Sequence, residues 1–398
     1  MASWAPGPNP FVLPLGGPQT ATAASAEARM TYFHERAGAT LYGNEASQVR
    51  WHRLDGQSEI DGCVVESVEI LKTPVFIRRG PEGFAILHLL LPLEDPISGL
   101  SQIVRLSSPQ VRERIDSLIG PAKTLKLPQR ATHITYLQCG ELLPLIGDAL
   151  PPWTPLNQML WTAAAATPLV EDGKISAIRP DPEDPEALLG LTYLSDSWRS
   201  LTLRDGVAFV SKPEAQEDSF LIHHAPVYVR SIYLDALLLG MIQHRALNEF
   251  ANRLSILDEQ VDRYAAIPLL EVDLTRFRNS VWWQHVTSGG HANAVLLNYQ
   301  REHRLPDLLL QITSEFFDFA RQVDADSSTR TGAALGLITL FGLPLTLALT
   351  ADQVFSTDGR LHVPADIISG LLFGLLLLLL PAARDLLQPL RRMRKRRR

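Results

Sequence analysis

Short runs of alternating hydrophobic and polar residues dominate the first half of the chain and predict β-strands. These runs cover residues 66–79, 84–91, 133–138, 198–204 and 207–211. The last two are separated by Asp205-Gly206, a dipeptide typical of two-residue turns, so we expect them to form a hairpin. Helical periodicity is less frequent here and predicts helices at 24–36, 108–118 and 158–166. The pattern therefore predicts an α+β domain over residues 31–225.

Proline and small residues mark the regions between these elements. Prolines recur between Gly140 and Leu188, which indicates loops. Residues 1–30 are rich in proline, glycine, alanine, serine and threonine and are nearly uncharged. Such a segment buries too little apolar surface to offset the conformational entropy lost on folding, so we expect it to be disordered.

The hydrophobic spacing becomes helical near Ser231, and we assign residues 226–330 to a helical stalk. Two seams repeat at alternating intervals of three and four residues, as in coiled coils. The first contains Leu247, Phe250, Leu254, Leu257, Val261 and Tyr264, and the second contains Leu309, Ile312, Phe316, Phe319 and Val323. We expect breaks between the helices around Pro268 and Gly289-Gly290. The seams suit either a helical hairpin within one subunit or a stalk that also packs against other copies.

A long uninterrupted helix is predicted after these breaks. No glycine and no further proline occurs between Pro306 and Gly332. A helix that continued from Pro306 to Thr350 would contain about 45 residues and extend about 67 Å. It would carry motion of the soluble domain directly into a membrane. The alternative is a break at the membrane surface, where the weak helix formers Asp324, Asp326 and residues 327–329 occur.

Two long apolar segments predict transmembrane helices. Residues 331–350 and 367–383 contain no charged side chain. About 20 apolar residues in a helix cross the bilayer core of about 30 Å, and a helix satisfies its own backbone hydrogen bonds in lipid. The six consecutive leucines at 375–380 leave no polar face for water, which disfavours a buried helix of a soluble core. We therefore expect a two-pass membrane protein.

The distribution of charge predicts the topology of these two spans. The loop 351–366 carries three aspartates and one arginine. The segment 384–398 after the second span ends in a basic tail made of Arg391, Arg392, Arg394, Lys395, Arg396, Arg397 and Arg398. The positive-inside rule places the tail and the N-terminal domain in the cytoplasm and the loop outside, in a cell inner membrane. The tail suits anionic lipid, with about 1 kcal/mol for each charge near that surface. The first residues lack a basic region before an apolar stretch, so we expect no cleavable secretory signal.

Small and polar residues share one side of the first apolar segment. Intervals of four and three residues separate Gly332, Gly336, Thr339, Leu343, Thr346 and Thr350. The stripe suits close helix packing, in which Gly332 and Gly336, and Gly370 and Gly374 of the second segment, let backbones approach. It also suits a pore wall, in which the hydroxyls of Thr339, Thr346 and Thr350 line a path for ions. Two helices of one subunit cannot enclose a pore, so conduction requires a homo-oligomer.

The sequence contains no common catalytic motif, so we expect neither an enzyme nor a bound cofactor. His223-His224 would point to opposite faces of a strand and would share a metal poorly. Cys63 and Cys139 have no CxxC partner and suit buried positions in a reducing compartment. The net charge is −6, and without the seven basic residues of the tail it would be −13. An acidic domain of this kind argues against binding to nucleic acid.

The order of these regions resembles that of the CorA-like divalent-cation transporter superfamily. Its members have a cytoplasmic α/β domain, then helices, then a long stalk helix that enters the first of two C-terminal spans, with a basic tail at the end. Residues 340–346 (LFGLPLT) are similar to the apolar-Pro-Leu-Thr run of the family's first span. The resemblance implies a CorA-like architecture and a pentamer. It also implies a divalent cation such as magnesium as the transported ion or regulator.

The chain departs from that family at the outer end of the first span. Family members carry a Gly-Met-Asn tripeptide there, which selects hydrated cations. This tripeptide does not occur in the chain, and residues 353–355 (QVF) take its place. One hypothesis is a cation channel or transporter with an altered mouth formed by Asp352, Gln353 and Asp358, whose carboxylates concentrate cations. The other is a membrane-anchored sensor, scaffold or leak-forming effector that keeps the fold without selective transport.

Overall fold

The structure is a computed structural model, and its described residues fall into two compact units. Unit 1 consists of Met1–Asp258 and Pro268–Ile312, and unit 2 consists of Glu259–Ile267 and Thr313–Arg398. Apart from Leu335, the predicted spans, outer loop and tail lie outside the described residues. The described residues are 4–6, 32–44, 47–74, 77, 83–106, 108–119, 128, 130–140, 152–168, 170–171, 174–175, 180–181, 183–212, 220–257, 263–288, 290–323, 325 and 335.

The first sheet of unit 1 is antiparallel, with strand order β1-β4-β6-β5 and with β7 also paired to β6. Its strands are β1 Ala5–Pro6, β4 Arg50–Leu54, β5 Glu59–Ile60, β6 Cys63–Lys72 and β7 Gly83–Leu90. Strand β7 confirms the strand predicted at 84–91, whereas β6 confirms the one predicted at 66–79 only as far as Lys72, since Thr73, Pro74 and Ile77 are not in a strand. Asp61 and Gly62 join β5 to β6 with φ values of 47° and 77°. An Asp-Gly hairpin turn requires these left-handed values.

One face of this sheet forms a hydrophobic core with α3 (Pro96–Arg105) and α4 (Pro109–Ile119), the latter close to the helix predicted at 108–118. A β-bulge interrupts β6 between Val65 and Ser67 and shifts its alternation. As a result Val65 and Val68 both belong to this core, while Ser67 and Glu69 face the other side. The core residues of the sheet are Ile60, Cys63, Val65, Val68 and Ile70, and those of the helices include Ile103, Val111, Ile115 and Leu118.

The second sheet of unit 1 has the strand order β11-β12-β13-β8. Strand β13 is parallel to β8 and antiparallel to β12. The strands are β8 His133–Gln138, β11 Leu191–Tyr193, β12 Trp198–Thr202 and β13 Gly206–Ser211. Helix α5 (Pro155–Ala165) forms a core with one face of the sheet and confirms the helix predicted near 158–166. Thr154 caps α5 and Pro155 occupies its first turn, which explains why the helix begins there.

The predicted hairpin of β12 and β13 is confirmed, but its turn lies one residue earlier than Asp205-Gly206. The amide of Leu203 donates to the carbonyl of Gly206 over 2.8 Å, so Arg204 and Asp205 are the turn residues. Gly206 is needed for a different reason. A Cβ atom there would lie 2.1 Å from His133 Cε1 and 2.3 Å from the carbonyl oxygen of Ala164. Glycine thus lets β13 pack tightly against β8 and α5.

The remaining elements are short. Helix α2 (Glu35–Tyr42) begins only near the end of the helix predicted at 24–36, and residues 32–34 are not helical, so that prediction is wrong for them. Two pairs of short strands are antiparallel, and η1 is a 3₁₀ turn. Their bounds are β2 Gly43–Asn44, β3 Ser47–Gln48, β9 Val170–Glu171, β10 Lys174–Ile175 and η1 Pro185–Leu188.

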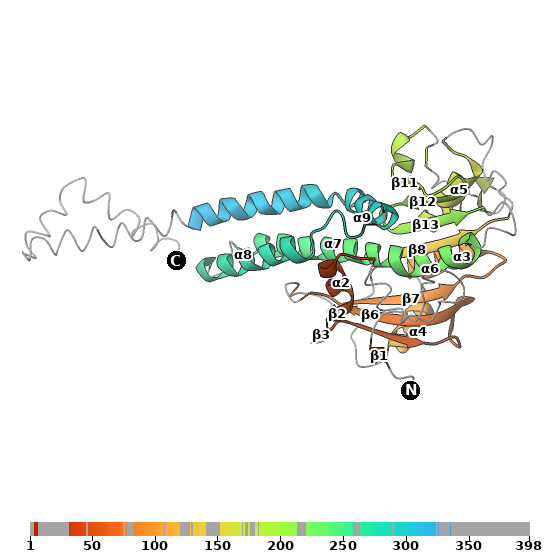
Figure 1. Ribbon diagram of the computed structural model, residues 1–398, viewed down its shortest axis with the longest axis horizontal. Helices are drawn as coiled ribbons and strands as arrows, with labels where there is room; N and C mark the ends of the chain where they lie inside the picture. Colours follow the sequence, from red (N-terminus) through yellow and green to blue (C-terminus); the bar gives the residue numbers. More distant parts are fainter. Residues whose placement is uncertain are drawn as a thin grey trace, which may run out of the picture. The chain divides into compact units, whose positions relative to one another are not determined.

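A continuous helical segment runs between the two larger sheets (Figure 1). It consists of η2 Phe220–His224, α6 Ala225–Tyr228, η3 Val229–Tyr233 and α7 Leu234–Ser255. Pro226 lacks an N–H group, and the wider π turns η2 and η3 flank it. The ring of Tyr233 stacks on Phe209 of β13 at 4.9 Å between centroids, while Asp235 contacts Arg50 of β4. The segment therefore joins both sheets.

This helical segment also has the length and composition of a membrane span. Among the described residues, Leu221–Ser255 is the one helix that meets both criteria, and its most apolar window of 18 residues has a mean hydropathy of 1.4. Of this window, 72% is buried inside the structure. A core helix of a soluble protein shows the same burial, so this helix adds only weak support for a membrane location.

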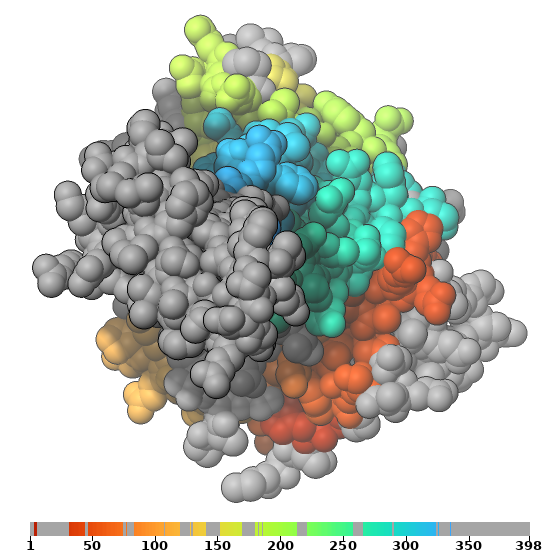
Figure 2. Space-filling view, turned by 90° about the vertical axis from the view of Figure 1, so that its left-hand side faces the viewer, coloured from red at the N-terminus to blue at the C-terminus, as the bar shows by residue number. Residues whose placement is uncertain are grey.

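The first predicted seam packs within the subunit. Leu247, Phe250 and Leu254 are buried, and the ring of Phe250 lies 5.5 Å from that of Phe277 on α8 (Arg263–Ser280). The break expected around Pro268 is wrong, because Pro268 lies inside α8. Figure 2 shows α2 beside α8, where Arg36 donates to the carbonyl of Asn279 over 3.2 Å.

The chain then turns and forms α9 (Gly290–Glu302), so the break expected around Gly289-Gly290 is confirmed. Arg304 has a φ of 49° and ends this helical run. Residues 305–323 are helical again. Ile312 and Phe316 of the second seam are buried, whereas Leu310 and Phe317 are exposed by 70% and 53%.

Candidate functional site

The candidate site is a cluster of charged side chains on the face of the first sheet that points away from its hydrophobic core. In the strand register Ser67 pairs with His88 and Glu69 pairs with His52, and paired residues share a face. Arg50 pairs with Leu71, two positions after Glu69, and so lies on the same face. The bulge in β6 directs Ser67 and Glu69 toward α7 rather than toward the core.

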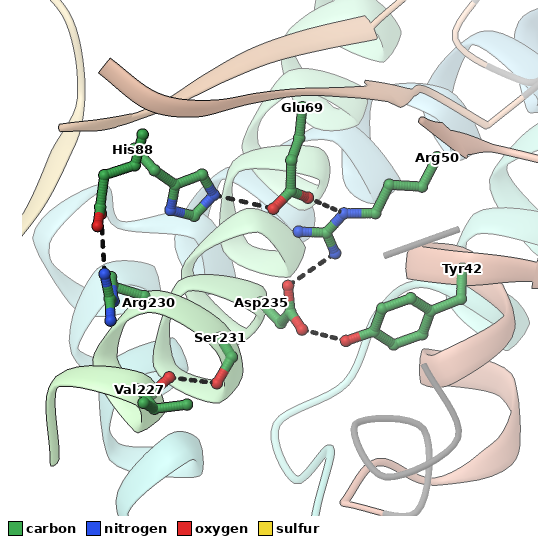
Figure 3. A network of polar contacts seen from close by, with 9 residues as sticks. Tyr42, Arg50, Glu69, His88, Val227, Arg230, Ser231 and Asp235 are labelled. Atoms are coloured by element: carbon green, nitrogen blue, oxygen red, sulfur yellow. Dashed lines mark hydrogen bonds and ion pairs between the residues drawn. The ribbon is translucent and has the colours of Figure 1, made fainter. Parts of the chain in front are cut away.

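Arg50 is the centre of this cluster (Figure 3). Its Nε donates to Glu69 Oε2 over 2.5 Å, and its Nη1 donates to Asp235 Oδ1 over 2.8 Å. Each carboxylate accepts one further hydrogen bond, because His88 Nε2 lies 2.8 Å from Glu69 Oε1 and the Tyr42 hydroxyl donates to Asp235. We call these five residues the Arg50 cluster.

The Arg50 cluster is almost completely shielded from water. The side chains of Arg50, Glu69 and Asp235 are 0% exposed, and that of His88 is 4% exposed. Burial alone would lower the pKa of Arg50, but Asp235 and Glu69 more than offset it and raise that pKa above its ordinary value. Arg50 therefore stays charged. Two carboxylates surround this one cation, and the hydrogen bonds of His88 and Tyr42 disperse the remaining negative charge.

The geometry of the Arg50 cluster favours a mechanical role. Substrates cannot reach side chains that are 0% exposed, so the cluster does not suit catalysis on a dissolved molecule. It connects β4, β6 and β7 to α2 and to the first turn of α7. A second, half-exposed ion pair between Arg230 of η3 and Glu66 of β6, 2.8 Å long, joins the same layers. Within the described residues, Arg50 Nη2 and Ser67 Oγ are buried without a hydrogen-bond partner.

The site residues predicted from the sequence do not belong to this cluster. The pore-wall threonines, the mouth residues, the packing glycines and the basic tail all lie outside the described residues. His223 and His224 are on the π turn η2 instead of a strand, and His223 is exposed while His224 is half-buried. The strand placement is wrong, because the chain is helical from Phe220 onward. Cys63 is buried as predicted, and Cys139 is half-buried.

Signals for the Arg50 cluster were nevertheless present in the sequence. Glu69 is an acid next to the apolar pair Ile70 and Leu71 of β6, and Asp235 is a lone acid in the run YLDALLLG. An acid on a buried strand or helix face requires a cation or a donor nearby. The sequence could not supply the pairing, since Arg50 is 19 positions from Glu69 and 185 from Asp235.

Comparison with known proteins adds no relative, since no family model, no curated protein and no solved structure matches the chain.

Proposed function

We propose that the chain is a two-pass membrane protein of CorA-like architecture that forms a homo-oligomeric path for divalent cations such as magnesium. The order of regions in the sequence carries this proposal. An α+β domain and helices precede two uncharged apolar segments, an acidic loop separates these segments, and a basic tail follows. The N-terminal domain and the tail would then be cytoplasmic, in the cell inner membrane.

The described helices support a connection between the soluble domain and the first span. The helical residues 305–323 lead in the sequence toward 331–350. The Arg50 cluster links the first sheet firmly to α7, and Phe250 on α7 packs on Phe277 of α8. A domain built in this way can move as a rigid body, which is what transmission of a cytoplasmic signal to a membrane helix requires.

A homo-oligomer requires a surface outside the packing of one subunit. Leu247, Phe250, Leu254 and Leu257 of the first seam are buried within the chain and cannot supply it, while Val261 and the side chain of Tyr264 lie outside the described part. Leu310 and Phe317 are exposed apolar residues that lie seven positions apart on the helical segment 305–323. This spacing returns to the same side of an α-helix, so the two residues offer a contact stripe to another copy.

In the membrane, the proposed path follows the hydroxyls of Thr339, Thr346 and Thr350. Rings of hydroxyl oxygens from several subunits can replace part of the hydration shell of a cation. Asp352 would form an acidic ring at the entrance and raise the local cation concentration. Gly332 and Gly336, with Gly370 and Gly374, would let the helices of the assembly approach closely.

The second candidate is a membrane-anchored sensor, scaffold or leak-forming effector with the same architecture. The observation in its favour is the sequence QVF at the position of the family's Gly-Met-Asn tripeptide. Without that tripeptide a pore of this type lacks its known selective mouth, and an assembly could admit ions without discrimination or admit none.

Reconstitution of the purified protein into liposomes separates these candidates. Vesicles that contain a magnesium indicator would report Mg²⁺ entry, and a potassium indicator in parallel vesicles would report a leak. The proposal requires Mg²⁺ entry well above that of protein-free vesicles and above K⁺ entry. Equal entry of both ions would favour the leak-forming effector, and entry of neither would favour the sensor or scaffold.

A further inference from the structure

Two histidines and a tyrosine from different elements meet at the end of α9 in unit 1. His244 belongs to α7, Tyr299 lies in the last turn of α9, and His303 directly follows that helix. The ring centroids of His244 and His303 are 4.4 Å apart, and those of Tyr299 and His303 are 4.3 Å apart. His303 Nε2 donates to the carbonyl of Arg204 over 2.8 Å.

This arrangement depends on close packing between α7 and α9. Gly240 lies one turn before His244, and a Cβ atom there would lie 2.6 Å from Cδ1 of Tyr299. Glycine therefore creates the space in which the buried Tyr299 ring rests on α7. The Tyr299 hydroxyl lies 3.4 Å from Nδ1 of His244, within hydrogen-bond reach. A neutral His244 whose Nδ1 carries no proton would accept this bond from the hydroxyl.

Polar contacts fix the same end of α9 to the second sheet. Asn298 Nδ2 donates to the carbonyl of Gly190 and to Thr192 Oγ1, each over 3.1 Å. Arg301 donates to the carbonyl of Leu189 over 2.9 Å. The hydrogen bond from His303 to the turn of β12 and β13 is the last of this series before the chain bends at Arg304.

The surroundings hold both imidazoles in the neutral form. Burial, with the neighbouring His303 and Arg204, lowers the pKa of His244 to about 4. Burial also lowers the pKa of His303, and Arg204 adds to this effect, although the hydrogen bond to the Arg204 carbonyl and the charge of Asp205 oppose it. Asp205 also faces a second cation, since its Oδ2 lies 3.9 Å from Nε of Arg130. Burial raises the pKa of Tyr299, and the charge of Asp205 adds to this effect, so its hydroxyl stays protonated at neutral pH.

We propose that His244 and His303 form an acid-sensitive latch that holds the end of α9 on α7 and on the β12–β13 turn and releases it when they are protonated. Protonation places two positive charges on rings whose centroids lie 4.4 Å apart beside Arg204, and their mutual repulsion disfavours the closed arrangement. The latch does not depend on ion conduction. If the proposed function holds, the released end lies directly before the helical segment that leads to the first apolar segment.

The direction of the pH dependence follows from the lowered pKa values. An unfolded histidine has a pKa of about 6.5. In the closed state the pKa of His244 is about 4. At pH values between these two pKa values, the open state therefore binds more protons than the closed state. The latch is therefore fully stable above this window and weakens as the pH falls through it.

Hydrogen exchange on the full-length protein in detergent tests the latch. Amide protection of residues 292–302, corrected for intrinsic exchange, should fall at least tenfold between pH 7.0 and pH 4.5. In the double variant His244→Gln with His303→Gln, the same change of pH should alter it by less than twofold. The exposed His223→Gln variant is the matched control and should behave as the wild type. An equal loss of protection in wild type and double variant would overturn the proposal.

A second variant keeps both histidines and so does not depend on the folding of the double variant. Arg204→Gln removes the neighbouring positive charge but leaves the backbone carbonyl that His303 contacts. Protonation then becomes easier, and the midpoint of the loss of protection should move to higher pH by at least half a pH unit. A midpoint that stays unchanged, or that moves to lower pH, would contradict the latch.

Discussion

Replacing Arg50 by methionine tests whether the Arg50 cluster holds the soluble domain together. Methionine keeps much of the buried apolar stem but removes the guanidinium group. Glu69 and Asp235 then remain 0% exposed without a cation between them. The substitution therefore turns two ion pairs into two uncompensated buried carboxylates.

The expected loss of stability is large. Removal of one partner from a buried ion pair destabilises a protein by about 3–5 kcal/mol, because the other charge is left buried and unpaired. Arg50 holds two such partners, and His88 and Tyr42 can compensate only part of the change. We expect a loss of about 4 kcal/mol or more, against a total stability of about 5–15 kcal/mol for a typical domain.

Chemical denaturation of the full-length protein in detergent measures this effect. The seven tryptophans, among them Trp51 beside Arg50, all precede the predicted spans, so tryptophan fluorescence reports on unfolding of the soluble part. Arg321→Met is a matched control, since Arg321 pairs with Asp318 at 3.9 Å with both side chains largely exposed. An exposed pair of this kind contributes about 0–1 kcal/mol, so the control should differ little from wild type.

Arg50→Lys distinguishes lost charge pairing from lost packing. Lysine keeps a charge but not the planar fork, and this variant should be intermediate. A loss below about 1 kcal/mol in Arg50→Met would refute this account of the cluster.

Three further predictions concern the membrane segments. A cysteine introduced at Ser356 in the outer loop should react with an impermeant thiol reagent on intact cells, and labelling only after lysis would invert the topology. Thr346→Leu should reduce Mg²⁺ entry into liposomes to the level of protein-free vesicles, because leucine narrows and dries the proposed path, and unchanged entry would place the path elsewhere. Asp352→Asn should reduce entry more at low than at high ionic strength, since salt screens the attraction of a carboxylate for cations, and a reduction independent of salt would argue against an electrostatic role.

Elements with strong local signals were predictable from the sequence. Strand β8 occupies residues 133–138, as its alternating pattern predicted. Helix α5 follows from its apolar pattern, although its start at Pro155 rather than 158 depends on the Thr154 cap. The Asp-Gly rule placed the β12–β13 hairpin correctly but missed its turn by one residue. There the need for glycine comes from contact with His133 rather than from the turn.

Features that depend on distant residues were not predictable. The bulge at Val65 and Ser67 changes which side chains face the core, and no local pattern indicates it. Arg50 and Asp235 meet only because the η3–α7 segment lies between two sheets. The buried seam at Leu247, Phe250 and Leu254 could not be assigned to contacts within or between subunits from its spacing alone. Its burial in one chain assigns it to the subunit interior.

The number of subunits tests the central claim most directly, because two helices of one chain cannot enclose an ion path. The mass of the protein in lipid nanodiscs, measured by light scattering with subtraction of lipid, should correspond to several copies, and to five if the resemblance holds. Leu310→Asp should reduce this mass by placing a charge on the exposed stripe, while Gln311→Asp on the next exposed position should leave it unchanged. A wild-type protein that is monomeric in the bilayer would contradict the proposed path for cations.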